Sequence, residues 1–278
     1  MPRHLVLLSI CEIALFLAGS PRAISGTSYA EYSEEKQAAY RYLMGGLSEE
    51  EKRKLTPPVV PRELPAARGN AATVACMDEK LKNGLYQVLA DDDLREQWDA
   101  SFHELGVWST VSPDKTDYSR LKPLVERVEA SSMSASEKMV HLGQAYLALG
   151  RIGTGEAMAF LSTRMTRDFW GSKMPETKTT DAESGESFTE NARSLAIQAY
   201  GARGDAKSVA RLESLAKKSE FSQHRELEQA IRYEVDNASD HRAQIEQDRA
   251  YYRFVRRGGS TSSQQTRDAT APQVDKTK

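Results

Sequence analysis

The chain of 278 residues carries 38 Lys and Arg against 40 Asp and Glu, so its formal net charge at pH 7 is −2. This balance does not favour nucleic acid or an anionic membrane surface as a partner. With 39% hydrophobic and 28% charged residues, the composition is that of a folded protein of one large or two small domains.

The N-terminus has the pattern of an export signal. Arg3 and His4 precede an apolar run from Leu5 to Gly19, and small residues follow up to Ser25. The run is shorter than the roughly 20 residues of a membrane span. We therefore predict a signal peptide over residues 1–25 and an exported, periplasmic or secreted protein without a membrane span in its mature form. Glu12 interrupts the apolar run, so an uncleaved N-terminal anchor is the alternative.

Residues 26–65 are predicted to contain N-terminal helices and a linker. Apolar residues between 29 and 47 follow helical spacing, and Ser48-Glu-Glu-Glu51 is the pattern of a capping box that opens a second helix to about Leu55. Four prolines between 57 and 65 then predict an extended linker, because each removes a backbone donor and restricts its neighbour.

Three helices are predicted at the start of a helical domain over residues 66–256. The first runs from Ala71 to Leu89, and the second begins at Asp91-Asp-Asp93 and ends near Leu105. The acidic triplet suits a helix N-terminus, whereas a calcium loop needs a different acidic spacing and a glycine. The third helix spans Asp117 to Val128, with Pro123 expected to delay its start.

The segment 134–236 contains one pattern twice, at an offset of 51 residues. In each copy a helix ends at glycines, a capping residue follows, and a second helix begins. The equivalent pairs are Ala145 and Ala196, Ala148 and Ala199, Gly150 and Gly201, Gly153 and Gly204, Thr154 and Asp205, Met158 and Val209, and Leu161 and Leu212. A single helix pair cannot bury its apolar stripe alone, so neighbouring pairs should stack. Further helices are expected over 222–236 and 240–256, followed by a disordered tail over 257–278.

The sequence from Leu149 to Leu161 resembles the turn of HEAT-type repeats, as does the sequence from Tyr200 to Leu212. In both, an apolar residue and a glycine end one helix, and the next helix begins at a capping residue. The resemblance implies an all-α fold, a short α-solenoid of antiparallel helix pairs. Leu142-Gly-Gln-Ala-Tyr146 is also similar to the start of a tetratricopeptide repeat, which is the second choice and implies the same architecture.

Motifs of catalysis or of metal and cofactor binding do not emerge from the sequence. The five histidines form no His-Glu-x-x-His pair, no cysteine has ligand spacing, and there is no Gly-x-Ser-x-Gly. His141 is expected to pack on a helix, and Cys76 to act as a small apolar residue. We therefore expect no cofactor and no enzyme activity, but an interaction module or scaffold for another protein. The alternative is a cell-envelope hydrolase or lyase with its site in a groove of the helical array.

Two groups of residues are candidates for contact with a partner. Phe169 and Trp170 lie in a polar insertion between the two copies of the pattern. Aromatic residues on loops often bind partners, although these two could fold back over a helix end. Arg203, Lys207 and Arg211 form a basic ridge around the second turn, which could equally be a solvated face.

Overall fold

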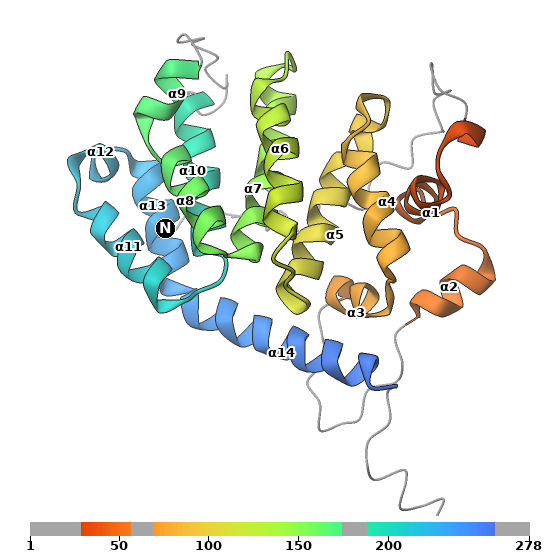
Figure 1. Ribbon diagram of the computed structural model, residues 1–278. Helices are drawn as coiled ribbons and strands as arrows, with labels where there is room; N and C mark the ends of the chain where they lie inside the picture. The colour runs from red at the N-terminus through yellow and green to blue at the C-terminus, as the bar shows by residue number, and fades with distance from the viewer. Residues whose placement is uncertain (1–28, 57–68, 174–187, 259–278) are drawn as a thin grey trace, which may run out of the picture.

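A computed structural model describes residues 29–56, 69–173 and 188–258 (Figure 1). Every regular element in these ranges is helical, which confirms the all-α fold. The export signal, most of the Pro-rich linker, part of the insertion before residue 188 and most of the tail lie outside the described residues. The elements are η2 (Tyr29–Glu31), α1 (Glu34–Leu43), α2 (Glu49–Leu55), α3 (Gly69–Cys76), α4 (Glu79–Leu89), η3 (Asp92–Gln97), α5 (Trp98–Val111), α6 (Asp117–Ala130), α7 (Ala135–Ile152), α8 (Gly155–Arg164), α9 (Arg167–Lys173), α10 (Phe188–Gly201), α11 (Ala206–Ala216), α12 (Ser219–Ser222), α13 (Arg225–Asp236) and α14 (Ala238–Arg256).

The helix starts follow the capping signals of the sequence. At α2 the Ser48 side chain accepts from the Glu51 N–H, and the Glu51 carboxylate accepts from the Ser48 N–H, which is the predicted capping box. The single helix predicted over 71–89 is wrong, because Asp78 caps α4 and separates it from α3. Pro123 does not delay α6, which begins at Asp117.

The two copies of the helix–turn–helix pattern have the same local structure. Gly153 and Gly204 both have φ of +61°, the left-handed conformation that glycine adopts most readily. Thr154 and Asp205, which follow them, cap α8 and α11 through side-chain hydrogen bonds. The two turns therefore share a left-handed glycine and a side-chain cap, although α7 ends at Ile152 and α10 already at Gly201.

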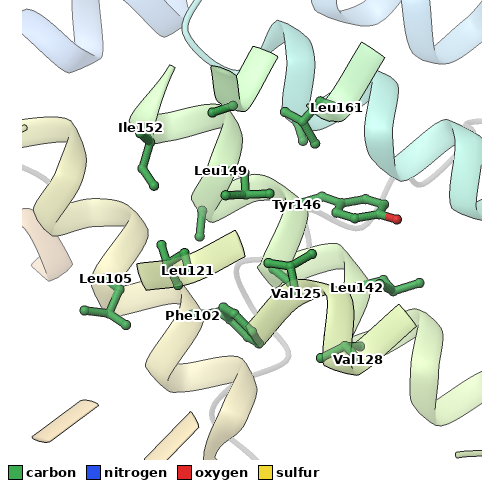
Figure 2. Close-up of a cluster of buried hydrophobic side chains, with 14 of the residues drawn as sticks. Phe102, Leu105, Leu121, Val125, Val128, Leu142, Tyr146, Leu149, Ile152 and Leu161 are labelled. Atoms are coloured by element: carbon green, nitrogen blue, oxygen red, sulfur yellow. The ribbon is translucent and has the colours of Figure 1, made fainter. Parts of the chain in front are cut away.

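Four helices, α5, α7, α10 and α13, pack side by side in chain order, and we call them the row (Figure 1). Helices α6, α8 and α11 pack against one face of the row, each between two of its helices or beside one. Figure 2 shows the core between α5, α6, α7 and α8, where Phe102, Leu121, Tyr146 and Leu161 are at most 1% exposed. Burying each such side chain stabilises the fold by about 1.5–3 kcal/mol.

Glycines let neighbouring helices of the row approach closely. A Cβ on Gly150 would lie 1.9 Å from the Ala199 carbonyl oxygen, and one on Gly106 would lie 2.9 Å from the Ala148 Cα. The prediction that Gly150 ends its helix is therefore wrong, whereas α10 does end at Gly201. Helix α7 continues to Ile152, and the chain turns at Gly153. Gly150 is required by the contact with α10 and not by the turn.

The last helix, α14, runs beside the ends of the row and returns to α3 (Figure 1). Its Tyr251 is 1% exposed and packs with Ala72 and Ala75. Helix α1 packs on α4, where Gly84 leaves room for the Glu35 carbonyl. None of the helices in the described ranges has the length and apolar character needed to cross a membrane.

Candidate functional site

Phe169 and Trp170 lie on helix α9 and not on an open loop. The Trp170 ring is 1% exposed, and its indole N–H donates to the Arg164 carbonyl at the end of α8 over 2.9 Å. Phe169 is half-buried, packs edge-on against Trp170 and lies 4.2 Å from the Arg164 guanidinium. The structure thus favours the alternative interpretation of these residues, in which they fold back over a helix end, and Trp170 in this conformation cannot contact a partner.

The basic ridge divides into one structural residue and two exposed ones. The Arg203 guanidinium donates to the carbonyl oxygens of Arg151 and Ile152 at the end of α7, over 3.1 and 2.9 Å. It passes directly over Gly153, where a Cβ would lie 2.2 Å from the Arg203 Cδ. Lys207 and Arg211 are exposed on α11.

The role of Arg203 is repeated along the chain. The C-terminal carbonyls of a helix form the negative end of its dipole, and cationic side chains stabilise them. Donors from other helices reach these oxygens: Arg256 reaches Met77 after α3, Arg127 reaches Leu89 and Ala90 at α4, Arg249 reaches Thr110 in α5, Lys138 reaches Glu129 in α6, Arg203 reaches the end of α7, and Trp170 and Arg193 reach Arg164 and Met165 at α8. Cationic side chains thus join helices at several places along the chain.

Buried ion pairs join the helices that cover the row. The Lys82 ammonium lies 2.9 Å from Asp117 Oδ1, and the two side chains are 2% and 0% exposed. Tyr86 donates to the same oxygen over 3.1 Å, and Ser109 donates to Oδ2 over 2.9 Å. A buried charge persists only when its partners are this complete. The carboxylate therefore fixes α4 and α5 to the first turn of α6.

A second buried pair joins α6 to α8. Arg164 donates from Nε and Nη2 to the two oxygens of Glu129, over 2.9 and 3.0 Å, and Tyr146 donates to Oε1 over 2.8 Å. The planar guanidinium matches the carboxylate at both oxygens, which makes this a strong and directional contact. Arg164 is 7% exposed and belongs to the interior.

A polar cluster between α1, α5 and α7 contains a carboxyl group with an unusual titration. Burial raises the pKa of Glu104 to about 7, opposed by a hydrogen bond from Tyr42 and by the charge of Arg151. Burial lowers the pKa of the neighbouring His103 to about 4, assisted by Arg151 and opposed by a hydrogen bond with Gln144. Glu104 as a whole is partly exposed, but its Oε2 is shielded from solvent and accepts no hydrogen bond. Sequence spacing could not reveal this cluster, because its members come from three helices.

One stretch of the outward side of α7 and α10 carries no charged residue, although Arg151 follows it one turn later on α7. Val140, Gly143, Gln144 and Leu147 follow one another at helical spacing on α7. The corresponding residues of α10 are Asn191, Ser194, Leu195 and Gln198. A Cβ on Gly143 would lie 3.7 Å from a Leu195 methyl group, so the two sets adjoin. We call these eight residues the neutral face; its Val140 is 57% exposed, and Tyr233 on α13, the next helix of the row, is 50% exposed.

His141 and Cys76 take part in helix packing, and Asp91–Asp93 lie at a surface hollow. His141 is 6% exposed, and its Nδ1 lies 2.6 Å from Asp99 Oδ1, as expected of a helix-packing residue. Cys76 is half-buried, and burial raises the pKa of its thiol. Within the described ranges no three His, Cys, Asp or Glu side chains gather as metal ligands. The acidic residues Asp91–Asp93 line an open hollow into which Lys36 extends to pair with Asp91.

Comparison with known proteins leaves the family open, since no protein-family model, curated protein or solved structure matches the chain.

Proposed function

We propose that the chain is an exported α-solenoid of HEAT-like helix pairs that binds another protein as an interaction module or scaffold. The repeated helix, left-handed glycine turn and capped helix at an offset of 51 support the architecture. Stacked pairs of this kind present long faces to solvent, which suits recognition of a protein surface.

The observation that carries the binding proposal is the neutral face. In a chain with 28% charged residues, eight neighbouring surface positions on two helices without a charge are a marked local departure. A partner that brought charged groups onto this face would lose their hydration without compensation. We therefore infer that the partner is a protein that presents an uncharged, largely apolar surface to α7 and α10.

Site-specific photo-crosslinking tests this proposal in the cell envelope of the source organism. Crosslinkers at Val140 and Gln198 are expected to yield one defined adduct, whereas one at the exposed Ser119 on α6 should not. The charge-introducing variant Val140→Glu should abolish the adduct formed at Gln198, and Ser119→Glu should leave it unchanged. Equal labelling at all positions, or an adduct that Val140→Glu does not affect, would refute the neutral face as the binding surface.

A crosslinker at Arg211 tests separately whether the partner binds at the basic ridge. The exposed Lys207 and Arg211, with the half-buried Phe169 on α9, remain the alternative contact. An adduct at Arg211 that is lost at high salt, with none at Val140, would place the partner on the ridge and make it an acidic one.

The export proposal is tested by N-terminal sequencing of the chain recovered from the source organism. A signal peptide over residues 1–25 predicts a mature N-terminus at or near Ser25 or Gly26. A chain that is exported but retains Glu12 would support the uncleaved anchor, and a full-length chain in the cytoplasm would exclude export.

A second candidate function is a cell-envelope hydrolase or lyase, and Glu104 is the observation that favours it. A carboxyl group with a pKa near 7 can hold a proton for general acid catalysis at neutral pH. The direct test compares the wild type with Glu104→Gln for release of soluble fragments from purified peptidoglycan. Activity that is lost in Glu104→Gln while the fold is retained supports this candidate, and no release by the wild type refutes it for this substrate.

A further inference from the structure

The corner between α13 and α14 consists of one residue. Helix α13 ends at Asp236, α14 begins at Ala238, and Asn237 between them has φ of −96° and ψ of 5°. Rotations of roughly 30° and 50° would bring Asn237 to regular α-helical angles. Its N–H already donates to the Tyr233 carbonyl, as in a continuous helix, over 3.0 Å. Its side chain does not cap α14 but donates Nδ2 to the same Tyr233 oxygen over 2.8 Å.

The specific contacts of α14 lie far along the chain from this corner. Arg249 donates to the Thr110 carbonyl of α5 over 2.9 Å, and Arg256 donates to the Met77 carbonyl after α3 over 2.8 Å. Tyr251 is buried among residues of α3. The surface that α14 covers thus belongs to α3 and α5 (Figure 1). An identical α14 from another molecule could make the same contacts there.

Only a few contacts hold the corner bent. Glu234 Oε2 lies 3.2 Å from His241 Nε2 across it, and the Ala238 carbonyl rests against Gly204. Straightening α13 into α14 would separate Glu234 from His241, because residues seven apart on one helix are about 10 Å apart along its axis. Every contact of α14 with α3 and α5 could be remade in an exchanged pair.

We propose that α14 exchanges between two copies of this chain, with α13 and α14 forming one continuous helix that places α14 of each copy on α3 and α5 of the other. The partner is a second copy of the chain, and the assembly is a two-fold dimer with identical reciprocal contacts. This inference is independent of the neutral face and of the proposed function.

The hinge can be tested by two variants that differ only in helix preference. Asn237→Ala and Asn237→Gly both lose the side-chain bond to Tyr233, but Ala favours the continuous helix by a factor of roughly five at each hinge. Since a dimer has two hinges, its association constant should be roughly 25-fold larger for Asn237→Ala than for Asn237→Gly. His241→Ala, which removes the contact across the corner, should also raise the dimer fraction. The measurement is sedimentation equilibrium, with circular dichroism to confirm that each variant is folded.

Crosslinking identifies the exchange itself. Cys76 at the end of α3 lies beside Arg256 and Tyr251 of α14, and Val255 packs against the same cluster. A Val255→Cys variant with Cys11→Ser, treated with a short bismaleimide, should link Cys76 to residue 255 within the chain in the monomer fraction. In the dimer fraction the same link should join two chains on a denaturing gel. The control Ser239→Cys, at the opposite end of α14, should form neither link.

Two outcomes would overturn the proposal. One is an Asn237→Ala protein that stays monomeric at every concentration at which it is soluble. The other is a dimer in which residue 255 is still linked to Cys76 of its own chain, which would show an ordinary association through another surface.

Discussion

Replacing Glu104 by Gln should give the protein a strong pH dependence of stability that the wild type lacks in the same range. In the folded protein the pKa of Glu104 is about 7, against 4.5 for an unperturbed glutamate. Between these pH values the folded chain holds a proton that the unfolded chain has released, so this residue makes stability fall as the pH rises. The difference between the folded and unfolded pKa of Glu104 corresponds to about 3 kcal/mol of unfolding free energy.

His103 acts in the opposite direction over nearly the same range. Its pKa is about 4 in the folded protein, against 6.5 for an unperturbed histidine. Between these values the unfolded chain holds a proton that the folded chain lacks, so this residue makes stability rise with pH, again by about 3 kcal/mol. In the wild type the two contributions largely cancel between pH 4.5 and 6.5.

The substitutions should separate them. In Glu104→Gln only His103 of this pair still titrates, so the free energy of unfolding should fall by about 3 kcal/mol as the pH falls from 6.5 to 4. In His103→Asn only Glu104 of this pair still titrates, so the free energy of unfolding should fall by about 3 kcal/mol as the pH rises from 4.5 to 7. Urea unfolding at pH 4.5, 5.5, 6.5 and 7.0 measures both slopes, and the other titrating groups cancel in the comparison with the wild type. Stability curves for Glu104→Gln and the wild type that run parallel would refute the raised pKa of Glu104, and parallel curves for His103→Asn and the wild type would refute the lowered pKa of His103.

Two further substitutions test the turn and the interior, each against a matched control. Gly204→Ala should destabilise the protein by more than about 1 kcal/mol in thermal unfolding, because its φ of +61° strains other residues and the added Cβ would lie 1.9 Å from the Ala238 oxygen. Gly155→Ala, with open space around its Cα, should be neutral or slightly stabilising; equal effects would contradict the assigned turn. Lys82→Met should cost about 3 kcal/mol in urea unfolding, since it leaves the Asp117 charge buried. The exposed Lys52→Met should change stability by less than about 0.5 kcal/mol, and a Lys82→Met protein as stable as this control would show that Asp117 is not held as a buried charge.

Local signals in the sequence predicted local structure well. The turn signal is a glycine followed by a residue whose side chain accepts from a helix N–H. This signal spans only a few residues, so the turns at Gly153 and Gly204 could be located without a structure. Ser48 and Glu51 form a capping box for the same reason. The all-α fold follows from the helical spacing of apolar residues throughout the chain.

Non-local contacts were the part that the sequence could not predict. Gly150 was interpreted as a helix breaker, but its role depends on the Ala199 backbone of another helix. The burial of Trp170 depends on the end of α8, and the donor role of Arg203 depends on the end of α7. Arg203 and Trp170, which the sequence suggested as binding residues, instead donate to backbone oxygens of other helix ends that no local pattern identifies.

The donors that reach the helix ends have a consequence for synthesis of the chain on the ribosome. Each lies later in the chain than the helix whose carbonyls it satisfies, as Arg127 does for α4 and Arg203 for α7. For α3 and α5 the donors Arg256 and Arg249 lie on α14, the last helix of the described residues. The first helices of the domain therefore leave the exit tunnel with these carbonyls still bound to water. They reach their final hydrogen bonding only when translation is almost complete.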